Sequence, residues 1–309
     1  LADDSATEAE TDHWLDAVRP AAEPALDPAR DTHGRAGQVV LDLDPDTTEA
    51  LLTWVPGVFH TDVDKLLLTA FGLAVADWRR SRGHSADAPV TVDLESHGRH
   101  EHIAAGTDLT RTTGWFTAMY PVTLNPQVTD WAEVWDGGQD AGRALRRVKE
   151  QLQTVPGDGL GYGLLRYVNP RTRARLAELP MPAFGFNYLG RYTGGRAAQG
   201  TAVPAAWSVL GRGVAGQHPD VALAHPVDLV AGAHDTERGP RLHSVWTFAS
   251  AVLSEEAVRR LGETWFRALR ALVEHAGRPE ASGLTPSDVS LASLSEDDIT
   301  RLESEWGSL

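Results

Sequence analysis

Residues 61–80 have the strongest periodic signal in the chain. Apolar side chains recur there at helical spacing from Val63 to Trp78, which places one whole face of a helix against a core. Thr61 and Asp64 stand three residues apart, the spacing of a capping box. The pattern predicts a long, largely buried helix.

A strand that ends in carboxylates is predicted next, from Val90 to Arg99. Apolar residues alternate there with polar ones, which is the period of a half-buried strand. Asp93 and Glu95 therefore share one face, and Gly98 allows the backbone to turn or to lie close to a ligand. Two interpretations stay open: an acid/base site built on Glu95, or the ordinary polar end of a strand that runs out to solvent.

The other predicted elements alternate without a strict strand–helix–strand repeat. Strands are predicted at residues 38–43, 114–124, 183–188, 221–230 and 241–249, and helices at 46–55, 131–152, 169–179 and from 254 onwards. The last two strands are expected to form a hairpin with a longer loop. The expected fold class is α/β (α+β), with a mixed β-sheet and helices packed mainly on one face.

Composition excludes several classes of function. The chain has 309 residues and no cysteine, which rules out disulfides, thiolate catalysis and cysteine-ligated metal centres. A formal net charge of −15 opposes binding to nucleic acid or to an anionic membrane. No apolar run approaches the roughly 20 residues of a membrane span, and the acidic N-terminus is unlike a signal peptide. We therefore expect a cytoplasmic protein.

Two basic clusters and one glycine-rich segment need interpretation. The segment at 157–163 follows a predicted helix, whereas a dinucleotide-binding loop follows a strand, so we expect no nucleotide site. The basic clusters are interpreted as solvated helix faces, with contact to a phosphate on a partner as the alternative. Their members are Arg143, Arg146, Arg147 and Lys149, and Arg166, Arg171, Arg173 and Arg175.

Four motifs, taken in order, resemble a known family. They are LESHGR at 94–99, DLTRTTGWFTAMYPV at 108–122, VPGDGLGYGLLRY at 155–167 and FNYLGR at 186–191. Together they are similar to the C-terminal lobe of an epimerization domain of a nonribosomal peptide synthetase, in the condensation-domain superfamily. The tail at 284–299 resembles the exit linker of that family.

The resemblance implies a fold and a reaction. Such domains resemble chloramphenicol acetyltransferase, with two lobes and a tunnel between them. As isomerases, they invert the Cα of an aminoacyl or peptidyl thioester held on the phosphopantetheine arm of a peptidyl carrier protein. The resemblance implies no cofactor, because the substrate arrives on the carrier protein. It also implies no metal, nucleic acid or membrane. Neighbouring synthetase domains are the other expected partners.

The resemblance also implies site residues. The Glu of its EGHGR motif is Glu95 here, and the Asn and Tyr of its FNYLG motif are Asn187 and Tyr188. The enolate formed from a thioester needs hydrogen-bond donors, which Asn187, Tyr188 or Arg111 could supply. Structural roles are the alternatives: Asn187 at a sheet edge, Tyr188 in the core, and Arg111 paired with Asp108.

The sequence departs from the family pattern in two places. Ser96 stands where Gly is usual, which the loop tolerates unless that position needs a positive φ. The HHxxxDG motif of the N-terminal lobe is absent, and we interpret the His60–Asp64 spacing as coincidence. His97, His100 and His102 are interpreted as solvated loop residues rather than as a metal cluster or a substitute base.

The absence of the HHxxxDG motif predicts a fragment that starts after the N-terminal lobe, which would then be a missing partner. The expected organisation is a lead-in helix and linker at 1–45, the C-terminal lobe at 46–280 and an exit linker at 281–309. Alone, such a chain should be inactive or nearly so. The alternative functions are a condensation-domain lobe that forms amides, and a non-catalytic module that docks a carrier protein.

Overall fold

The computed structural model describes residues 1–18, 25–86, 88–101, 106–192, 217–279, 281, 284–289, 298 and 301. Its centre is a six-stranded sheet in the order β1-β6-β5-β4-β2-β3. The strands are β1 Ala36–Asp42, β2 Val90–Ser96, β3 Ala118–Leu124, β4 Phe184–Tyr192, β5 Val227–Thr236 and β6 Gly239–Ala249. β4 runs parallel to β2 and to β5, and the other neighbouring pairs are antiparallel. The sheet is therefore mixed, as predicted.

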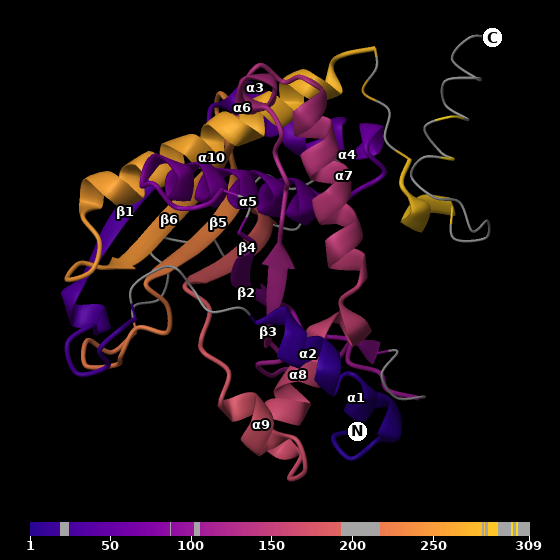
Figure 1. Ribbon diagram of the computed structural model, residues 1–309, viewed down its shortest axis with the longest axis vertical. Coiled ribbons are helices and arrows are strands. Elements are labelled where there is room, and N and C mark those ends of the chain that lie inside the picture. The colour runs from indigo at the N-terminus through magenta and orange to yellow at the C-terminus, as the bar shows by residue number, and fades with distance from the viewer. Residues whose placement is uncertain are drawn as a thin grey trace, which may run out of the picture.

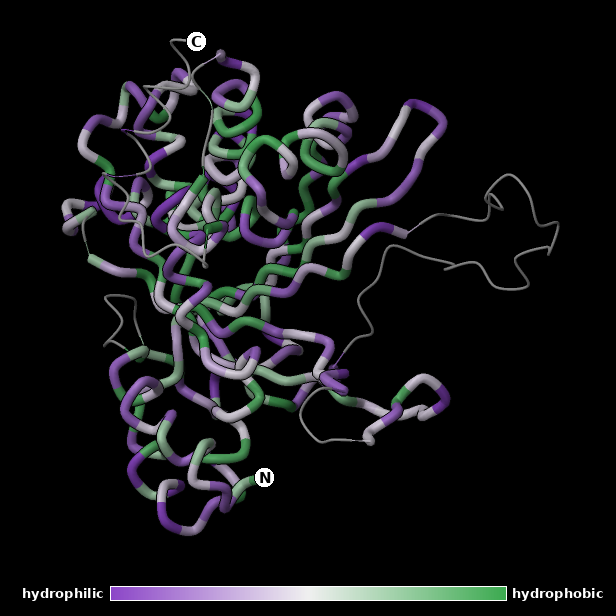
Figure 2. Tube along the Cα trace, turned by 90° about the vertical axis from the view of Figure 1, so that its right-hand side faces the viewer, coloured by the Kyte–Doolittle hydropathy of each residue, from purple (hydrophilic) through white to green (hydrophobic). Residues whose placement is uncertain are grey.

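Two long helices, α5 Val63–Ser81 and α10 Glu255–Ala276, pack on one face of this sheet (Figure 1). Phe71 of α5 contacts the rings of Phe184 and Phe186, and Trp265 of α10 packs against Trp246. Hydrophobic and hydrophilic residues alternate along the strands (Figure 2), so the strands turn one apolar face to the helices. The core lies between these two layers.

The other helices are shorter. They are α1 Ser5–Ala9, α2 Thr11–Ala17, α3 Pro45–Leu52, α4 Val55–Val58, α6 Trp131–Trp135, α7 Gln139–Gln153, α8 Leu160–Gly163 and α9 Arg173–Ala177. The helix predicted at 61–80 is confirmed as α5, but its capping box is not formed: the cap is Asp62, without a side-chain hydrogen bond. No helix in the described parts of the chain is long and apolar enough to cross a membrane.

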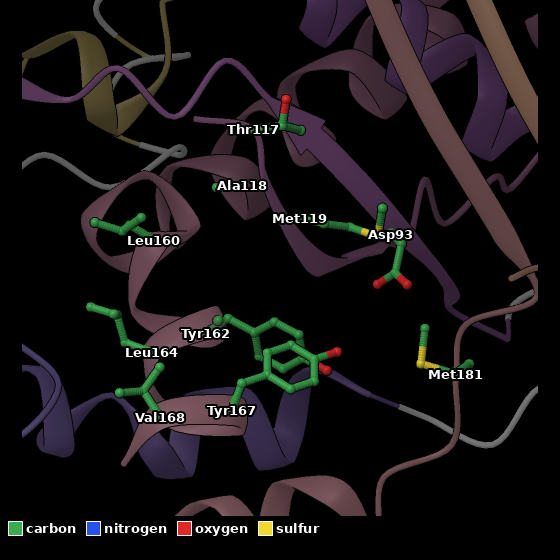
Figure 3. A pocket seen from close by; sticks show the side chains of 11 residues that line it. Asp93, Thr117, Ala118, Met119, Leu160, Tyr162, Leu164, Tyr167, Val168 and Met181 are labelled. Atoms are coloured by element: carbon green, nitrogen blue, oxygen red, sulfur yellow. The ribbon is translucent and has the colours of Figure 1, made fainter. Parts of the chain in front are cut away.

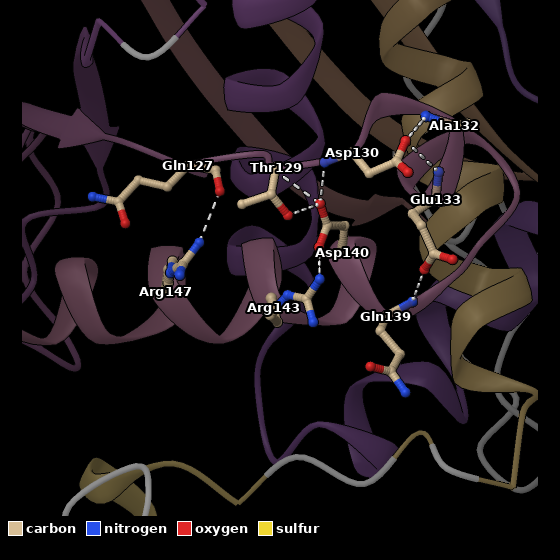
Figure 4. Close-up of polar contacts among 9 residues, drawn as sticks. All are labelled: Gln127, Thr129, Asp130, Ala132, Glu133, Gln139, Asp140, Arg143 and Arg147. Carbon is tan, nitrogen blue, oxygen red and sulfur yellow. Dashed lines mark hydrogen bonds and ion pairs between the residues drawn. The ribbon is translucent and has the colours of Figure 1, made fainter.

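The helix predicted over 131–152 is two helices. Gly137 interrupts it with a φ of +61°, a conformation that side chains rarely adopt. Asp140, at the start of α7, accepts hydrogen bonds from the backbone N–H groups of Thr129 at 2.9 Å and Asp130 at 2.5 Å (Figure 4). These bonds link the start of α7 to the segment that precedes α6. Asp130 in turn caps α6 by accepting from the backbone N–H of Ala132. The helical period continues across the break, which is why periodicity alone missed it.

The hairpin predicted between the last two strands has a shorter loop than expected. β5 extends to Thr236 and β6 begins at Gly239, so only Glu237 and Arg238 connect them. The start of the segment expected as a loop instead continues β5, in which buried residues alternate with half-buried ones as far as His234. Register with β6, rather than local composition, determines where the strand ends.

The predicted lead-in and exit segments both pack against the lobe. Trp14 of α2 is fully buried beside Tyr162, and β1 is an edge strand of the sheet. Near the other end, Asp288 forms a 2.5 Å ion pair with Lys149 of α7, whose side chain is only 2% exposed. Residues on both sides of the predicted boundaries at 45 and 281 therefore contribute to one packed body.

Several members of the two basic clusters have partners inside the protein. In the first cluster, Arg143 pairs with Asp140 and Arg147 donates to the carbonyl oxygen of Gln127 at 2.8 Å. In the second, Arg171 pairs with Glu8 of α1. The interpretation as solvated faces is therefore wrong for the buried Lys149 and incomplete for these arginines.

Candidate active site

The candidate site lies on the sheet face opposite α5 and α10, where β2 ends. Val92 and Leu94 of β2 point to the helices, so Asp93 and Glu95 point the other way. On β4 the same alternation sends Phe184, Phe186 and Tyr188 to the helices, and Gly185 and Asn187 to the face of Glu95. A parallel pairing of β2 with β4 brings these two polar rows together.

Glu95 and Asn187 meet across this pair of strands. The side-chain amide of Asn187 donates a hydrogen bond to the Glu95 carboxylate, and both side chains are half-buried. Burial raises the pKa of Glu95, and the negative charge of Asp228 raises it further, against the lowering effects of His225 and the Asn187 hydrogen bond. A carboxylate whose pKa is raised is a stronger base than an ordinary one, which suits a group that must take a proton and return it.

An apolar pocket of about 320 Å³ lies at this end of the sheet, lined by Asp93 and Met119 among others (Figure 3). One wall is formed by Met119 of β3, which lies directly opposite Glu95 in the antiparallel register, and by Asp93. The facing wall comes from the glycine-rich segment and the turn after it, with Tyr162 and Tyr167. The glycine-rich motif, which we excluded as a nucleotide loop, thus lines a pocket together with Met119, the register partner of Glu95.

The structure does not bring Tyr188 and Arg111 to this pair. Tyr188 follows Asn187 directly and so points to the helix face, where burial raises its pKa to about 12. Arg111 is exposed in the loop between β2 and β3. Asp108 accepts from the backbone and side chain of Thr110, not from Arg111, at 2.9 and 2.5 Å. Their roles in the reaction stay predictions.

The departures from the family motif also have positions in the structure. Ser96 is the last residue of the extended strand β2, so the residue is compatible with its backbone. In the loop that follows, the centroids of the His97 and His100 rings lie 5.1 Å apart, and Nδ1 of His100 lies 3.3 Å from Oδ2 of Asp158. His102 lies outside the described residues. No group of histidine or carboxylate side chains able to hold a metal ion occurs among the residues described.

Sequence reasoning missed a buried ion cluster next to Glu95. His225 Nε2 lies 2.9 Å from Asp93 Oδ2, and its Nδ1 lies 2.7 Å from Asp228 Oδ1. Burial lowers the pKa of His225, but the hydrogen bonds to Asp228 and Asp93 outweigh it and raise the pKa to about 10. Asp228, which interrupts the apolar run of residues 227–233, was the available signal, but Asp93 lies 132 residues before His225 in the chain.

This cluster makes stability depend on pH. Because the pKa of His225 is raised from 6.5 to about 10 by folding, its stabilising contribution is complete below pH 6.5 and is lost as pH rises through about 10. We expect the free energy of unfolding to fall by more than about 1 kcal/mol across this interval, since one pKa unit corresponds to about 1.4 kcal/mol. Urea denaturation at several pH values measures it.

The His225→Gln variant is the control for this prediction. It should be less stable than the parent at neutral pH, because the buried Asp93 and the half-buried Asp228 lose their counter-ion. Its stability should also change less between pH 6.5 and pH 10. Parallel pH profiles for the two proteins would show that another group is responsible.

Comparisons with known proteins now place this geometry in a family. A sequence model described as the Condensation domain matches residues 3–295. The chain belongs to the condensation-domain family. It is 32% identical over 275 residues to a linear gramicidin synthase of Brevibacillus parabrevis. It is 33% identical over 300 residues to a chondramide synthase of Chondromyces crocatus. These matches cover 88% and 96% of this chain, but 5% and 7% of the relatives.

Solved structures agree with this assignment. The epimerization domain from the third module of tyrocidine synthetase B superposes with a TM-score of 0.69 and 28% identity, over 89% of this chain and 57% of that one. The X-domain from teicoplanin biosynthesis shares the fold, with a TM-score of 0.56 and 17% identity, over 89% of this chain and 56% of that one. The expected chloramphenicol-acetyltransferase-like fold is confirmed.

Proposed function

We propose that this condensation-family chain forms one side of an epimerase active site, which inverts the Cα of an aminoacyl or peptidyl thioester held on a carrier protein. The observation on which this rests is the half-buried Glu95, which is hydrogen-bonded to Asn187 and lies opposite Met119, a residue that lines the apolar pocket. The likeness to an epimerization domain over 89% of the chain supports it. The lobe would be the C-terminal one, with residues 46–280 as its body.

The proposed reaction uses Glu95 as one member of an acid/base pair. Its carboxylate takes the α-proton, and the electron pair of the broken C–H bond moves into the thioester carbonyl to form an enolate. A second group on the opposite side of the substrate then gives a proton to Cα, so the configuration is inverted without net change in atoms or charge. The hydrogen bond from Asn187 holds the carboxylate in a fixed orientation.

The proposal requires a second acid/base group. His225 cannot fill this role because both of its ring nitrogens are engaged by carboxylates. We infer that the group comes from an N-terminal lobe, which fits the 57% coverage of the epimerization-domain chain. The partners would then be a peptidyl carrier protein with its phosphopantetheine arm, that lobe, and neighbouring synthetase domains.

Amide formation is the second candidate function. The matched family is described as the Condensation domain, and condensation would join two carrier-bound substrates rather than move a proton at Cα. Epimerization is favoured by the half-buried Glu95 carboxylate with its raised pKa, because amide formation does not require a base at the α-carbon. A non-catalytic carrier-docking module predicts neither reaction.

Exchange of the α-proton with solvent separates these functions. The chain, within its synthetase, is incubated in deuterated water with an aminoacyl thioester on a carrier protein, and deuterium at Cα is followed by mass spectrometry. Epimerization predicts exchange and a mixture of D and L products. With a second carrier-bound aminoacyl thioester added, amide formation without exchange would support condensation instead, and the absence of both reactions would contradict the proposed function.

The same assay on the isolated 309-residue chain tests the requirement for a second lobe. We expect exchange to be at least about 100-fold slower than in the synthetase, because one member of the acid/base pair is then lacking. Adding the N-terminal lobe in trans should restore part of the rate. Full exchange by the chain alone would contradict the proposed division of the active site.

A further inference from the structure

Two neighbouring rows of side chains cross the face that holds Glu95. In one row, Asp93 of β2, Gly185 of β4 and Asp228 of β5 lie side by side in register. In the other row, Glu95 of β2 lies beside Asn187 of β4, to which it is hydrogen-bonded. The rows are two residues apart along each strand, so the first row is the nearest polar neighbour of the second.

The His225 ring closes the first row. It bridges Asp93 and Asp228 with distances of 2.9 and 2.7 Å, and its side chain is only 2% exposed. A neutral imidazole has a single N–H, so it can donate to only one of two carboxylates. Because both nitrogens face a carboxylate, the doubly protonated, positively charged ring is the form that donates to both, and the raised pKa of His225 agrees with it.

Gly185 makes the space for this bridge. A Cβ at that position would overlap both the Asp228 carboxylate and the His225 ring. Pro226, the residue after His225, restricts the backbone of His225 to extended conformations, so the ring is held before β5 begins. Three segments that are distant in sequence therefore meet around one cation.

Resting on the proposed function, we propose that His225 is a positioning residue for Glu95. Its ring contacts both Asp93 and Asp228, and it thereby holds β2, β4 and β5 in the register that brings Glu95 to Asn187. It also balances one of the two negative charges in the first row, so that Glu95 ionises beside a cluster with a net charge of −1.

The charged groups around Glu95 indicate what each substitution should do. Among the described residues that face it, Asp228 raises the pKa of Glu95 and His225 lowers it. Asp93 lies on the same strand face, and its charge acts on Tyr162 across the pocket. Removing the charge of Asp228 should therefore make Glu95 more acidic, whereas removing the charge of His225 should make it less acidic.

The test uses Asp228→Asn and His225→Gln, each with the pH dependence of α-proton exchange in the synthetase as readout. Asp228→Asn keeps an acceptor for His225 and should move the acidic limb of the profile to lower pH by about half a unit or more. His225→Gln should move it to higher pH. Shifts of the acidic limb in opposite directions are expected only if His225 and Asp228 act on Glu95 through their charges. A loss of packing would lower the exchange rate in both variants without moving the limb in opposite directions.

A second Asp–His pair provides the matched control. Asp42 of β1 and His243 of β6 lie 2.8 Å apart on strands at the other side of the sheet. Asp42→Asn makes the same change of charge, so it should leave the profile of the exchange reaction unchanged. An equal shift in this variant would overturn the local role of the His225 cluster.

A direct titration separates this inference from the proposed function. The side-chain carboxyl carbon of Glu95 in the isotopically labelled 309-residue chain is followed by NMR, with its signal assigned by Glu95→Gln. Opposite shifts in the two variants support the positioning role even if the synthetase exchanges no α-proton, in which case only the proposed function fails. A Glu95 titration that neither variant moves overturns the inference, whatever the activity.

Discussion

Replacing Glu95 with glutamine should reduce α-proton exchange by about 10² to 10⁴-fold, the usual contribution of a general acid/base. Glutamine has the same shape and keeps an oxygen for the hydrogen bond from Asn187, but it cannot take a proton from Cα. The measurement is deuterium incorporation at Cα of the carrier-bound substrate under saturating conditions. Carrier binding should be unchanged, so the loss should appear in the turnover rate.

The control for this variant is Glu237→Gln. Glu237 is an exposed residue in the turn between β5 and β6, and its substitution makes the same change of charge. Its exchange rate should equal that of the parent protein. If Glu95→Gln retained full exchange and inverted product, Glu95 would have no acid/base role and the proposed function would lose its main support.

A Gly98→Ala substitution should damage both stability and activity. Gly98 has a φ of +63°, and an added Cβ would overlap the backbone carbonyl oxygen of Phe116, which cannot move independently of its loop. The strain of the backbone costs about 1–3 kcal/mol, and the overlap must separate the segments that flank β2 and β3. Since Glu95 lies opposite Met119 on these strands, we expect at least about a tenfold loss of exchange.

Gly83→Ala separates the two causes. Gly83 follows α5 with a φ of +80°, but no atom lies within 4 Å of the position that its Cβ would take. This variant should lose about 1–2 kcal/mol from the left-handed backbone alone and should keep full exchange activity. Chemical denaturation and the exchange assay measure both quantities. Equal losses of activity in the two variants would show that the Phe116 contact does not position the site.

Gly98 shows what the local sequence could predict and what it could not. The sequence predicted a turn or a close approach at this residue, and the structure has both: a left-handed backbone and a contact with the Phe116 carbonyl. The close approach is to the protein itself and not to a ligand. Local chemistry thus identified the need for glycine, whereas the identity of the neighbour depended on a separate segment, the one that leads into β3.

For Asn187 and Tyr188 too, the local sequence could not predict which neighbours the side chains would have. The resemblance to the FNYLG motif selected both residues, but adjacent residues of a strand point to opposite faces. Only the parallel pairing of β4 with β2 decides that Asn187 meets Glu95 and that Tyr188 joins the helix face. Periodicity gives the alternation, but it does not say which of the two faces belongs to the site.

The sequence by itself determined the buried helix α5, the strand that delivers Glu95, the mixed fold class and the family. Each of these depends on spacing within a short segment or on an ordered set of motifs. The tertiary structure alone decided the meeting of Asp93, Gly185, His225 and Asp228, because parallel strands are joined by long connections. Their contacts are fixed by sheet register and burial, which act between residues that local patterns cannot connect.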